Sequence, residues 1–275
     1  MLNNTMTDII ACPKCKNRVD LIDEELVCNY CNTNYKIIND IPVMLNGKTP
    51  FKPDKDKISS AINYHLRELD TAKDAYDHRH LNPNVKNEHK AILDIGCGIG
   101  QSFIGTGIYN DNTRNLLGID IDFEALTYGK LQYSNISFIN SYGENLPIIS
   151  NSIDLVISRV SLPYTNIPLV IKEIHRVLKI NGELWITLHS FNMTAKSLFR
   201  STKNLKYRDM IFRTYVVLNG FIFHFFGKLF TFPIFGRVES FQTNKAIRRL
   251  LKKENFGNIE IMRERHFLVK AVKKN

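Results

Sequence analysis

The chain has 275 residues, of which 44% are hydrophobic and 23% charged, a composition typical of globular proteins and not of disordered or collagen-like ones. Its first residues, MLNNTMTDII, lack the basic and apolar regions of a secretion signal, so we expect a cytoplasmic protein. The longest apolar stretch, residues 215–236, is interrupted by Asn219, His224, Lys228 and Pro233, which makes it a poor membrane span. The net charge of +10 comes from residues 190–275, which carry 18 Lys and Arg against 5 Asp and Glu, together with 13 of the 17 Phe. This tail is therefore expected to meet an anionic surface, an apolar surface or both.

Four of the five cysteines lie near the start of the chain, in two Cys-x-x-Cys pairs: Cys12, Cys15, Cys28 and Cys31. Two such pairs can place four thiolates around one zinc ion, each pair on a tight turn. Disulfides suit exported chains, and a redox Cys-x-x-Cys would explain only one of the two pairs. The sequence thus predicts a structural zinc site, which leaves no coordination position open for chemistry.

Short strands are expected around these cysteines. Residues 19–22 and 25–27 can form a hairpin about Asp23-Glu24, and residues 35–38 and 41–45 supply two further strands. The motifs CPKC, CNYC and NTNYKIINDIPVML resemble the small zinc-ribbon proteins that activate tRNA and translation-factor methyltransferases, over residues 8–46. We expect residues 1–46 to form a zinc ribbon that depends on its metal to fold and that can unfold without the rest of the chain.

Residues 47–89 are expected to form a linker followed by a helix that covers the next domain. The linker is the polar run NGKTPFKPDKDK, and helical content follows over residues 58–77.

A strand at residues 90–95 runs directly into the glycine-rich turn Gly96-Cys-Gly98-Ile-Gly100. A strand, a glycine-rich turn and a helix form the first unit of a doubly wound α/β sheet, in which the turn lets the backbone approach a ligand. Asp94 stands just before this turn, a poor position beside a pyrophosphate and a good one beside an ammonium group. Cys97 is expected to be small apolar filler in this turn.

Further strands are expected at residues 115–119, 136–140, 153–158 and 183–189. Asp120 ends the first of them, where a carboxylate can accept both hydroxyls of a ribose. Asp122 fits either a nucleotide contact or a helix N-cap, and Asp154 a structural role. A helix is predicted to be capped by Asn166 and to end at Asn181-Gly182.

These blocks resemble the class I S-adenosylmethionine-dependent methyltransferases, in particular the subgroup that includes the quinone-biosynthesis enzymes. The matching blocks are ILDIGCGIG, LLGIDID, SYGENLPIISNSIDLVISRV and EIHRVLKINGELWITLHS. The resemblance implies a mostly parallel seven-stranded sheet over residues 90–275 and S-adenosylmethionine as cofactor. It also implies a set of cofactor-binding residues: Asp94 for the methionine amine, the backbone of Gly96, Gly98 and Gly100, Asp120 for the ribose, and Ile121 or Asp122 beside the adenine.

The adenine loop departs from the subgroup's usual Gly-Asp-Ala, since this chain has Ser141-Tyr142-Gly143. The side-chain acceptor for the adenine amino group is therefore absent or replaced by a tyrosine hydroxyl. The backbone amide of Gly143 can still serve the ring, and Glu144 is not a substitute.

Four residues near the carboxyl ends of two strands are candidates to face the acceptor: Ser158, Arg159, Tyr164 and His189. His189 is the best placed to take a proton, although a surface or loop histidine without such a role is the simpler interpretation. No catalytic residue is assigned, because a sulfonium donor is already activated and a base is needed only for a protonated acceptor. The Asn-Pro-Pro-Tyr type signature of exocyclic amino-group methylation is absent.

Residues 190–241 are expected to form a Phe-rich basic insert, with seven Phe between residues 221 and 235. It could be a buried lid, a dimer contact, an interfacial segment that recruits an amphiphilic acceptor, or a platform for RNA. Phe clustered this tightly suits burial or lipid better than base stacking.

We therefore expect a methyltransferase that acts on a small or amphiphilic acceptor, with a peripheral position at a membrane surface as one possibility. Methylation of ribosomal or transfer RNA is the alternative, favoured by the ribbon and the basic tail. A non-catalytic regulator that binds the cofactor is a further alternative. The acceptor and the oligomeric state cannot be read from the sequence.

Overall fold

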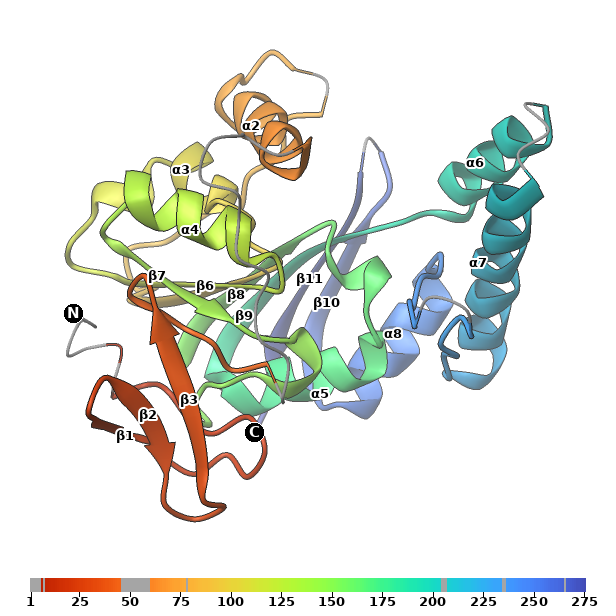
Figure 1. Ribbon diagram of the computed structural model, residues 1–275. Helices are drawn as coiled ribbons and strands as arrows, with labels where there is room; N and C mark the ends of the chain where they lie inside the picture. The colour runs from red at the N-terminus through yellow and green to blue at the C-terminus, as the bar shows by residue number, and fades with distance from the viewer. Residues whose placement is uncertain are drawn as a thin grey trace.

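A computed structural model describes residues 6, 8–45, 60–77, 79–203, 207–233, 236–264 and 266–275 (Figure 1). Within these ranges it holds two sheets. The first is a four-stranded antiparallel sheet of order β1-β2-β3-β4, and the second has seven strands in the order β10-β11-β9-β8-β5-β6-β7. The predicted α/β class with a preceding ribbon is confirmed.

The small sheet is built from β1 (Asp20–Ile22), β2 (Glu25–Cys28), β3 (Thr33–Ile38) and β4 (Ile41–Pro42). Asp23 and Glu24 have positive φ values of 46° and 63° in the turn between β1 and β2. The register pairs Ile22 with Glu25, which makes this the expected two-residue hairpin.

The large sheet begins with β5 (Ala91–Ile95), β6 (Asn115–Asp120), β7 (Ile136–Asn140) and β8 (Ile153–Arg159), all parallel to one another. It is completed by β9 (Leu178–Leu188), parallel to β8, and by the antiparallel pair β10 (Phe256–Met262) and β11 (Phe267–Lys273). Its central strands are buried on both faces, as parallel sheets require.

Helices cover both faces of this sheet (Figure 1). On one face lie α2 (Ser60–Lys73), α3 (Gln101–Gly105) and α4 (Phe123–Gln132), and on the other α5 (Ile167–Val177) and α8 (Asn244–Lys253). Short 3-10 turns occur at Ile108–Asn110, Gly143–Asn145 and Leu162–Tyr164. Neighbouring residues of β5 point to opposite cores: Ile92 belongs to the α3–α4 side and Leu93 to the α5–α8 side.

Two details of α5 differ from the prediction. Asn166 occupies the N-cap position, but its side chain makes no capping hydrogen bond. The helix ends at Val177, and Asn181-Gly182 lies within β9, where Asn181 has a φ of 63°. The strand register jumps here, from Ile153–Leu178 to Leu155–Glu183, so these two residues form an irregularity in a strand instead of a helix end.

The ribbon does not stand apart from the large sheet, contrary to the expectation of an independent unit. Ile10 and Met44 belong to the same buried cluster as Leu146 and Ile148. Backbone pairing also joins the two parts: Val43 forms a parallel bridge with Asn140, the last residue of the edge strand β7. The amide of Met44 donates to Asn140 at 2.8 Å. The ribbon thus covers one edge of the large sheet, as Figure 1 shows.

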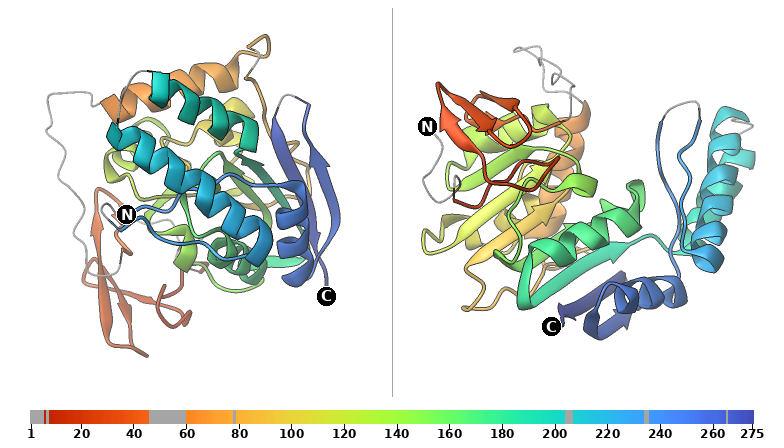
Figure 2. Two further views of the ribbon diagram at one scale, coloured as in Figure 1. Left: turned by 90° about the vertical axis from the view of Figure 1, so that its right-hand side faces the viewer. Right: turned by 90° about the horizontal axis from the view of Figure 1, so that it is seen from below.

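The insert forms a helical hairpin, α6 (Phe191–Lys203) and α7 (Tyr207–Phe226), which projects from the end of the sheet beyond β9 (Figures 1 and 2). Of the expected linker, residues 46–59 lie outside the described residues, as do Lys206 and Phe235 of the insert. No helix in the described ranges is both long and apolar enough to cross a membrane.

Candidate functional site

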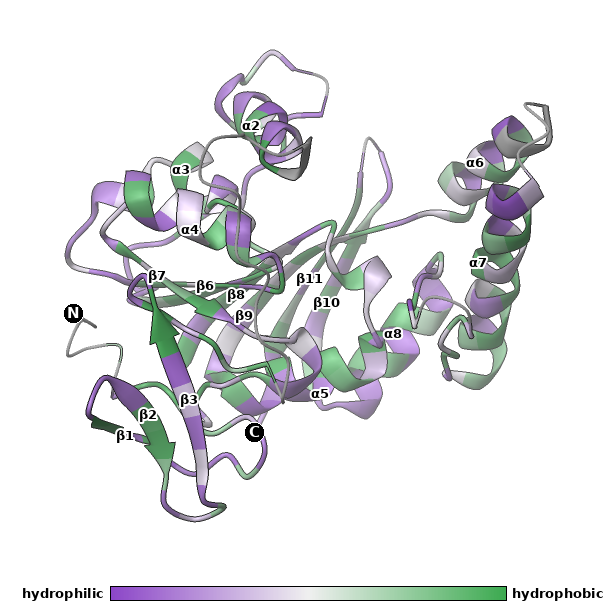
Figure 3. Ribbon diagram, in the orientation of Figure 1, coloured by the Kyte–Doolittle hydropathy of each residue, from purple (hydrophilic) through white to green (hydrophobic). Residues whose placement is uncertain are grey.

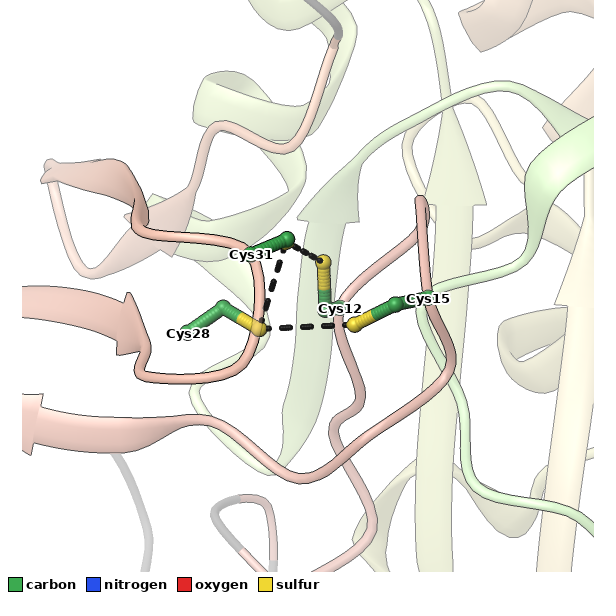
Figure 4. A group of neighbouring side chains, drawn as sticks. All are labelled: Cys12, Cys15, Cys28 and Cys31. Atoms are coloured by element: carbon green, nitrogen blue, oxygen red, sulfur yellow. Dashed lines mark hydrogen bonds between the residues drawn. The ribbon is translucent and has the colours of Figure 1, made fainter.

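The four cysteines of the ribbon meet at one point. Their sulfur atoms all lie within 4.8 Å of one another, with Cys12–Cys31, Cys28–Cys31 and Cys15–Cys28 at 3.4, 3.4 and 3.5 Å (Figure 4). A tetrahedral zinc with bonds of about 2.3 Å would place its sulfur ligands roughly 3.8 Å apart. The donor set and its spacing therefore fit a structural zinc ion, as predicted.

A tyrosine supports this cluster. The hydroxyl of Tyr35, a buried residue of β3, lies 3.1 Å from the sulfur of Cys12. Such contacts orient metal ligands and tune their basicity. Four protein thiolates leave no open position, so this site holds shape and does no chemistry.

A cavity of about 570 Å³ lies at the carboxyl ends of β5, β6 and β8. This is the end of a parallel sheet where ligands bind in α/β proteins. Helix α2 contributes to its lining through Tyr64, His65 and Glu68, and residues 236–239, which follow α7, form another part of the wall.

Asp94 is not itself among the residues that line this cavity, but it directly precedes the lining residues Ile95 and Gly96. It is 1% exposed, and neither of its carboxylate oxygens has a hydrogen-bond partner among the described residues. Burial raises the pKa of Asp94 to about 7, and the nearby charge of Asp120 adds to this, whereas the hydroxyl of Ser102 and the charge of Arg159 oppose it. A buried carboxylate with both oxygens unsatisfied is costly unless a ligand completes it.

Two glycines of the glycine-rich turn have no space for a side chain. Gly96 has a φ of 75°, and a Cβ there would lie 2.1 Å from the Cβ of Ser161. Gly98 has a φ of 53°, and a Cβ there would lie 2.4 Å from the Nδ1 of His65. The turn therefore requires glycine at both positions. Gly96 lines the cavity, while Gly98 and Gly100 shape the turn behind it.

Asp120 lines the cavity at the end of β6. Its carboxylate accepts hydrogen bonds from the amides of Gly98 at 2.8 Å and Asp122 at 2.9 Å. Each oxygen thus has one protein donor, and lone pairs remain for a ligand. Burial raises the pKa of Asp120 although both amides oppose this. The neighbouring Ile121 is 60% exposed and also lines the cavity.

Asp122, by contrast, is a helix cap. Its Oδ1 accepts from the amides of Glu124 and Ala125 at 3.1 Å, at the start of α4. Its Oδ2 lies 3.8 Å from the Nε2 of His65. Asp154 is structural in the same sense, because it accepts from the amides of Lys90 and Ala91 and pairs with Lys179.

Ser141, Tyr142 and Gly143 all line the cavity. Glu144 lines it too, but its Oε1 accepts from the amide of Asn166 at 2.9 Å and so holds the start of α5. The carboxylate of Glu144 is thereby engaged with the protein, consistent with not treating it as a substitute for the adenine acceptor.

Of the four residues proposed to face the acceptor, Arg159 and Tyr164 line the cavity, whereas Ser158 and His189 do not. The hydroxyl of Ser158 is within 2.6 Å of that of Ser161. His189 is 5% exposed, and its ring packs edge-on against Tyr164 at 5.2 Å. Burial lowers the pKa of His189 to about 4, helped by the charge of Arg213, so the ring is neutral at physiological pH.

Several cavity residues were not anticipated from the sequence: Tyr64, His65, Glu68, Ser161 and Glu239. His65 contacts the amide of Gln101 at 2.8 Å through Nδ1. Glu239, 8% exposed, accepts from Arg213 of α7 at 3.0 Å. Apart from Ser161, which follows β8, these residues come from the covering helix and the insert, where no motif marks a site. The only sequence signal for Glu239 is its rarity, since Asp209 and Glu239 are the sole acids between residues 190 and 241.

Two family models match the chain. Residues 93–186 match a methyltransferase domain, and residues 3–40 match a Trm112p-like protein. The first interval contains the cavity residues of β5, β6 and β8, and the second contains all four zinc-ligand cysteines.

Similar curated proteins divide in the same way. A malonyl-[acyl-carrier protein] O-methyltransferase of Hamiltonella defensa is 28% identical over 92 residues, which cover 33% of this chain and 34% of that protein. A UPF0434 protein of Nitrosococcus oceani is 36% identical over 58 residues, which cover 20% of this chain and 98% of that protein. The chain thus spans about a third of the length of the curated methyltransferases it matches.

Among solved structures, a methyltransferase of Thermotoga maritima, described as S-adenosylmethionine-dependent and a possible histamine N-methyltransferase, has a TM-score of 0.50 at 15% identity. The match covers 78% of this chain and 96% of that chain, and it shows a shared fold. The quinone-biosynthesis subgroup stays a prediction. The chain belongs to the Trm112p-like UPF0434 family through its N-terminal ribbon, and it joins to that ribbon a methyltransferase domain of the S-adenosylmethionine-dependent class.

Proposed function

We propose that the chain transfers a methyl group from S-adenosylmethionine to a small or amphiphilic acceptor. One observation carries the proposal: the buried carboxylate of Asp94, whose oxygens have no hydrogen-bond partner among the described residues, lies next to Ile95 and Gly96, which line the cavity at the carboxyl edge of the sheet. A cation with N–H donors would satisfy both oxygens of Asp94, and the amino group of the cofactor has that chemistry.

The protein's contribution is binding and orientation. When bound, the cofactor supplies a methyl group on a sulfonium, which is already activated for displacement. Asp94 would hold the amino group, Asp120 the ribose hydroxyls, and the 141–143 loop with Ile121 would flank the adenine. Helix α2 and residues 236–239 would exclude water from the acceptor side.

The acceptor class is supported by the position of the insert. Residues 236–239, which line the cavity, follow the end of the Phe-rich hairpin α6–α7 after nine residues. A general base is not needed for an acceptor that is ionised at working pH. The neutral, buried His189 lies outside the cavity lining and is not assigned a catalytic role.

The proposal is tested by calorimetry with S-adenosylmethionine and by transfer of a labelled methyl group to a lipid extract, to small carboxylic acids and to RNA. We expect Asp120→Ala to weaken cofactor binding by about tenfold to a hundredfold, because a charged acceptor of hydrogen bonds is lost. Asp154→Asn is the matched control, since this carboxylate supports the sheet away from the cavity.

Cofactor binding without transfer to any acceptor would favour the non-catalytic alternative, and transfer to RNA alone would favour the RNA alternative. Failure of the wild-type chain to bind the cofactor would refute the proposal.

A further inference from the structure

Arg159 is a largely buried cation whose guanidinium lacks some of its hydrogen-bond partners. Its side chain is 12% exposed and lines the cavity at the end of β8. The Nη1 atom has no hydrogen-bond partner among the described residues, and the Nη2 atom lies 4.0 Å from the Oε2 of Glu68, at the limit of an ion pair. The contacts that hold this guanidinium are therefore incomplete.

A largely buried guanidinium with unmade hydrogen bonds would be stabilised by an anion. Arg presents a planar fork of N–H donors that matches a carboxylate with two parallel hydrogen bonds. A buried charge without such partners destabilises the free protein. A ligand that supplies the missing hydrogen bonds offsets this cost, and the offset adds to its binding free energy.

The surrounding negative charges disfavour a dianion more strongly than a monoanion. Glu68, Asp120, Glu144 and Glu239 line the same cavity, and a dianion such as phosphate would be repelled by these carboxylates more strongly than a carboxylate would.

We propose that Arg159 binds a carboxylate in the cavity. Two sources have this chemistry: the carboxylate of the methionine end of the cofactor, and a carboxylic acid on the acceptor. The cofactor source rests on the proposed function, whereas the acceptor source can be tested without it.

The cofactor arm compares S-adenosylmethionine with decarboxylated S-adenosylmethionine by calorimetry, in the wild type, in Arg159→Met and in Arg159→Lys. If the cofactor supplies the carboxylate, the wild type should prefer the intact compound by roughly tenfold or more, as expected for a charged hydrogen bond. Arg159→Met should remove most of this preference, and Arg159→Lys, which keeps the charge but loses the fork, should retain part of it. Glu260→Gln, a change at an exposed position of β10 away from the cavity, is the control and should keep the preference.

The acceptor arm titrates octanoate and octanol into protein loaded with S-adenosylhomocysteine, and into the free protein. If the acceptor supplies the carboxylate, Arg159→Met should weaken octanoate binding about tenfold and leave octanol unchanged. An unaltered preference for the intact cofactor together with unaltered octanoate binding, in a variant with a wild-type melting temperature, would overturn the proposal. A wild type that binds no cofactor would refute the proposed function, yet octanoate binding to the free protein would still decide the role of Arg159.

A separate observation concerns the outer face of α7. Tyr207, Ile211, Leu218, Phe221 and Phe225 recur at intervals of three, four or seven residues, so they share one face of the helix. Their exposed fractions lie between 42% and 67%. Figure 2 shows α6 and α7 at the outside of the molecule, and Figure 3 shows hydrophobic positions along α7. Contiguous exposed apolar faces of this kind mark interaction sites.

The exposed charges among the described residues of the insert are predominantly positive. Asp209 and Glu239 are the only acids between residues 190 and 241, and Arg213 pairs with both, at 3.5 and 3.0 Å. Exposed cations remain at five described positions of the insert: Lys196, Arg200, Arg208, Lys228 and Arg237.

We propose that the α6–α7 face binds an anionic lipid surface, with the apolar face at the acyl boundary and the cations at the headgroups. Charge complementarity selects this partner. A second copy would bring like charges together, and aliphatic Ile211 and Leu218 do not offer stacking surfaces to RNA bases. Because residues 236–239 continue from α7 to the cavity wall, binding there would place the acceptor side of the cavity close to the lipid.

The test is sedimentation with phosphatidylcholine vesicles, with and without phosphatidylglycerol. The wild type should bind the anionic vesicles several-fold more strongly, and salt should weaken this binding. The double variant Leu218→Ser, Phe225→Ser should lose it. The matched control is Leu131→Ser, which removes a side chain that is 78% exposed at the end of α4.

Vesicle binding that survives the double change would overturn this second proposal. Concentration-dependent dimerisation, or RNA binding, that the same changes abolish in a chain without affinity for vesicles would also overturn it.

Discussion

Asp94 shows how one side chain can be costly in the free protein and useful in the complex. Its folded-state pKa of about 7 lies above the ordinary value of 3.8, because burial disfavours the charged form. The folded protein therefore binds more protons than the unfolded chain between about pH 4 and 7. The free energy of unfolding must fall as the pH rises through this window, and level off above it.

We predict that the Asp94→Asn variant does not show this fall in the free energy of unfolding as the pH rises. The variant should be more stable than the wild type at pH 8, by up to the order of 4 kcal/mol, and about equally stable near pH 4. Denaturant unfolding at both pH values measures the difference. Cofactor affinity should show the opposite trend, since the ionised carboxylate attracts the amino group: it should rise towards pH 8 in the wild type and be weak in the variant. Equal pH dependence of stability in both proteins would show that Asp94 is charged at no cost.

At the scale of single residues, the sequence predicted the positions that belong to a local sequence motif. Asp94 and Asp120 lie at the carboxyl ends of strands that their apolar runs make visible, the glycine turn follows the first of these strands, and the cavity forms beside them. His65 and Glu239 could not be found in this way, because the chain folds them over the cavity from segments distant in sequence. His189 illustrates the converse: its position in the sequence suggested a base, and packing made it a buried, neutral ring.

At the scale of elements, the contact between the ribbon and α5 contains a buried charge network. Glu173 of α5 accepts hydrogen bonds from Lys16 of the ribbon at 2.7 Å and from Arg176 at 2.8 and 2.9 Å. Burial alone would raise the pKa of Glu173, but the hydrogen bonds from Arg176 and Lys16 outweigh it and hold the pKa below 4.5. The stabilisation is thus present above pH 4.5 and is lost as the pH falls through the lowered value.

We predict that Glu173→Gln destabilises the chain by about 1–3 kcal/mol at pH 7, because two cations lose a charged acceptor. Denaturant unfolding should show the loss at pH 7, and the loss should shrink as the pH falls through the lowered pKa of Glu173 and its carboxyl becomes protonated. Glu260→Gln, a change at an exposed position of β10, is the control and should have no such effect. A Glu173→Gln protein as stable as the wild type at pH 7 would mean that the network contributes nothing net.

The element boundaries also show where sequence patterns fail. Most strands with alternating or continuous apolar runs were placed within a residue or two. The end of the strand predicted at residues 41–45, the start of the strand predicted at residues 183–189 and the end of α5 were not. Asn-Gly is a common helix end, and only the pairing of β9 with β8 reveals that here it accommodates a change of strand register.

At the scale of the whole molecule, the ribbon and the methyltransferase domain share one buried core, and we expect them to unfold together. We predict that zinc removal lowers the melting temperature of the entire chain in a single transition, by roughly 10 °C or more, since each kcal/mol corresponds to about 2–4 °C in a chain of this size. Calorimetry before and after chelation measures this, with zinc added back as the control. Two separate transitions, the upper one unchanged by chelation, would show that the domains unfold independently.

The pairing of Val43 and Met44 with the end of β7 has a further consequence, which concerns stoichiometry. Because the ribbon and the edge strand β7 belong to one polypeptide, the effective concentration of the ribbon at this sheet edge is on the order of millimolar. A free-standing ribbon protein would have to reach a similar concentration to displace it. The methyltransferase domain of this chain therefore carries its ribbon at a fixed ratio of one to one.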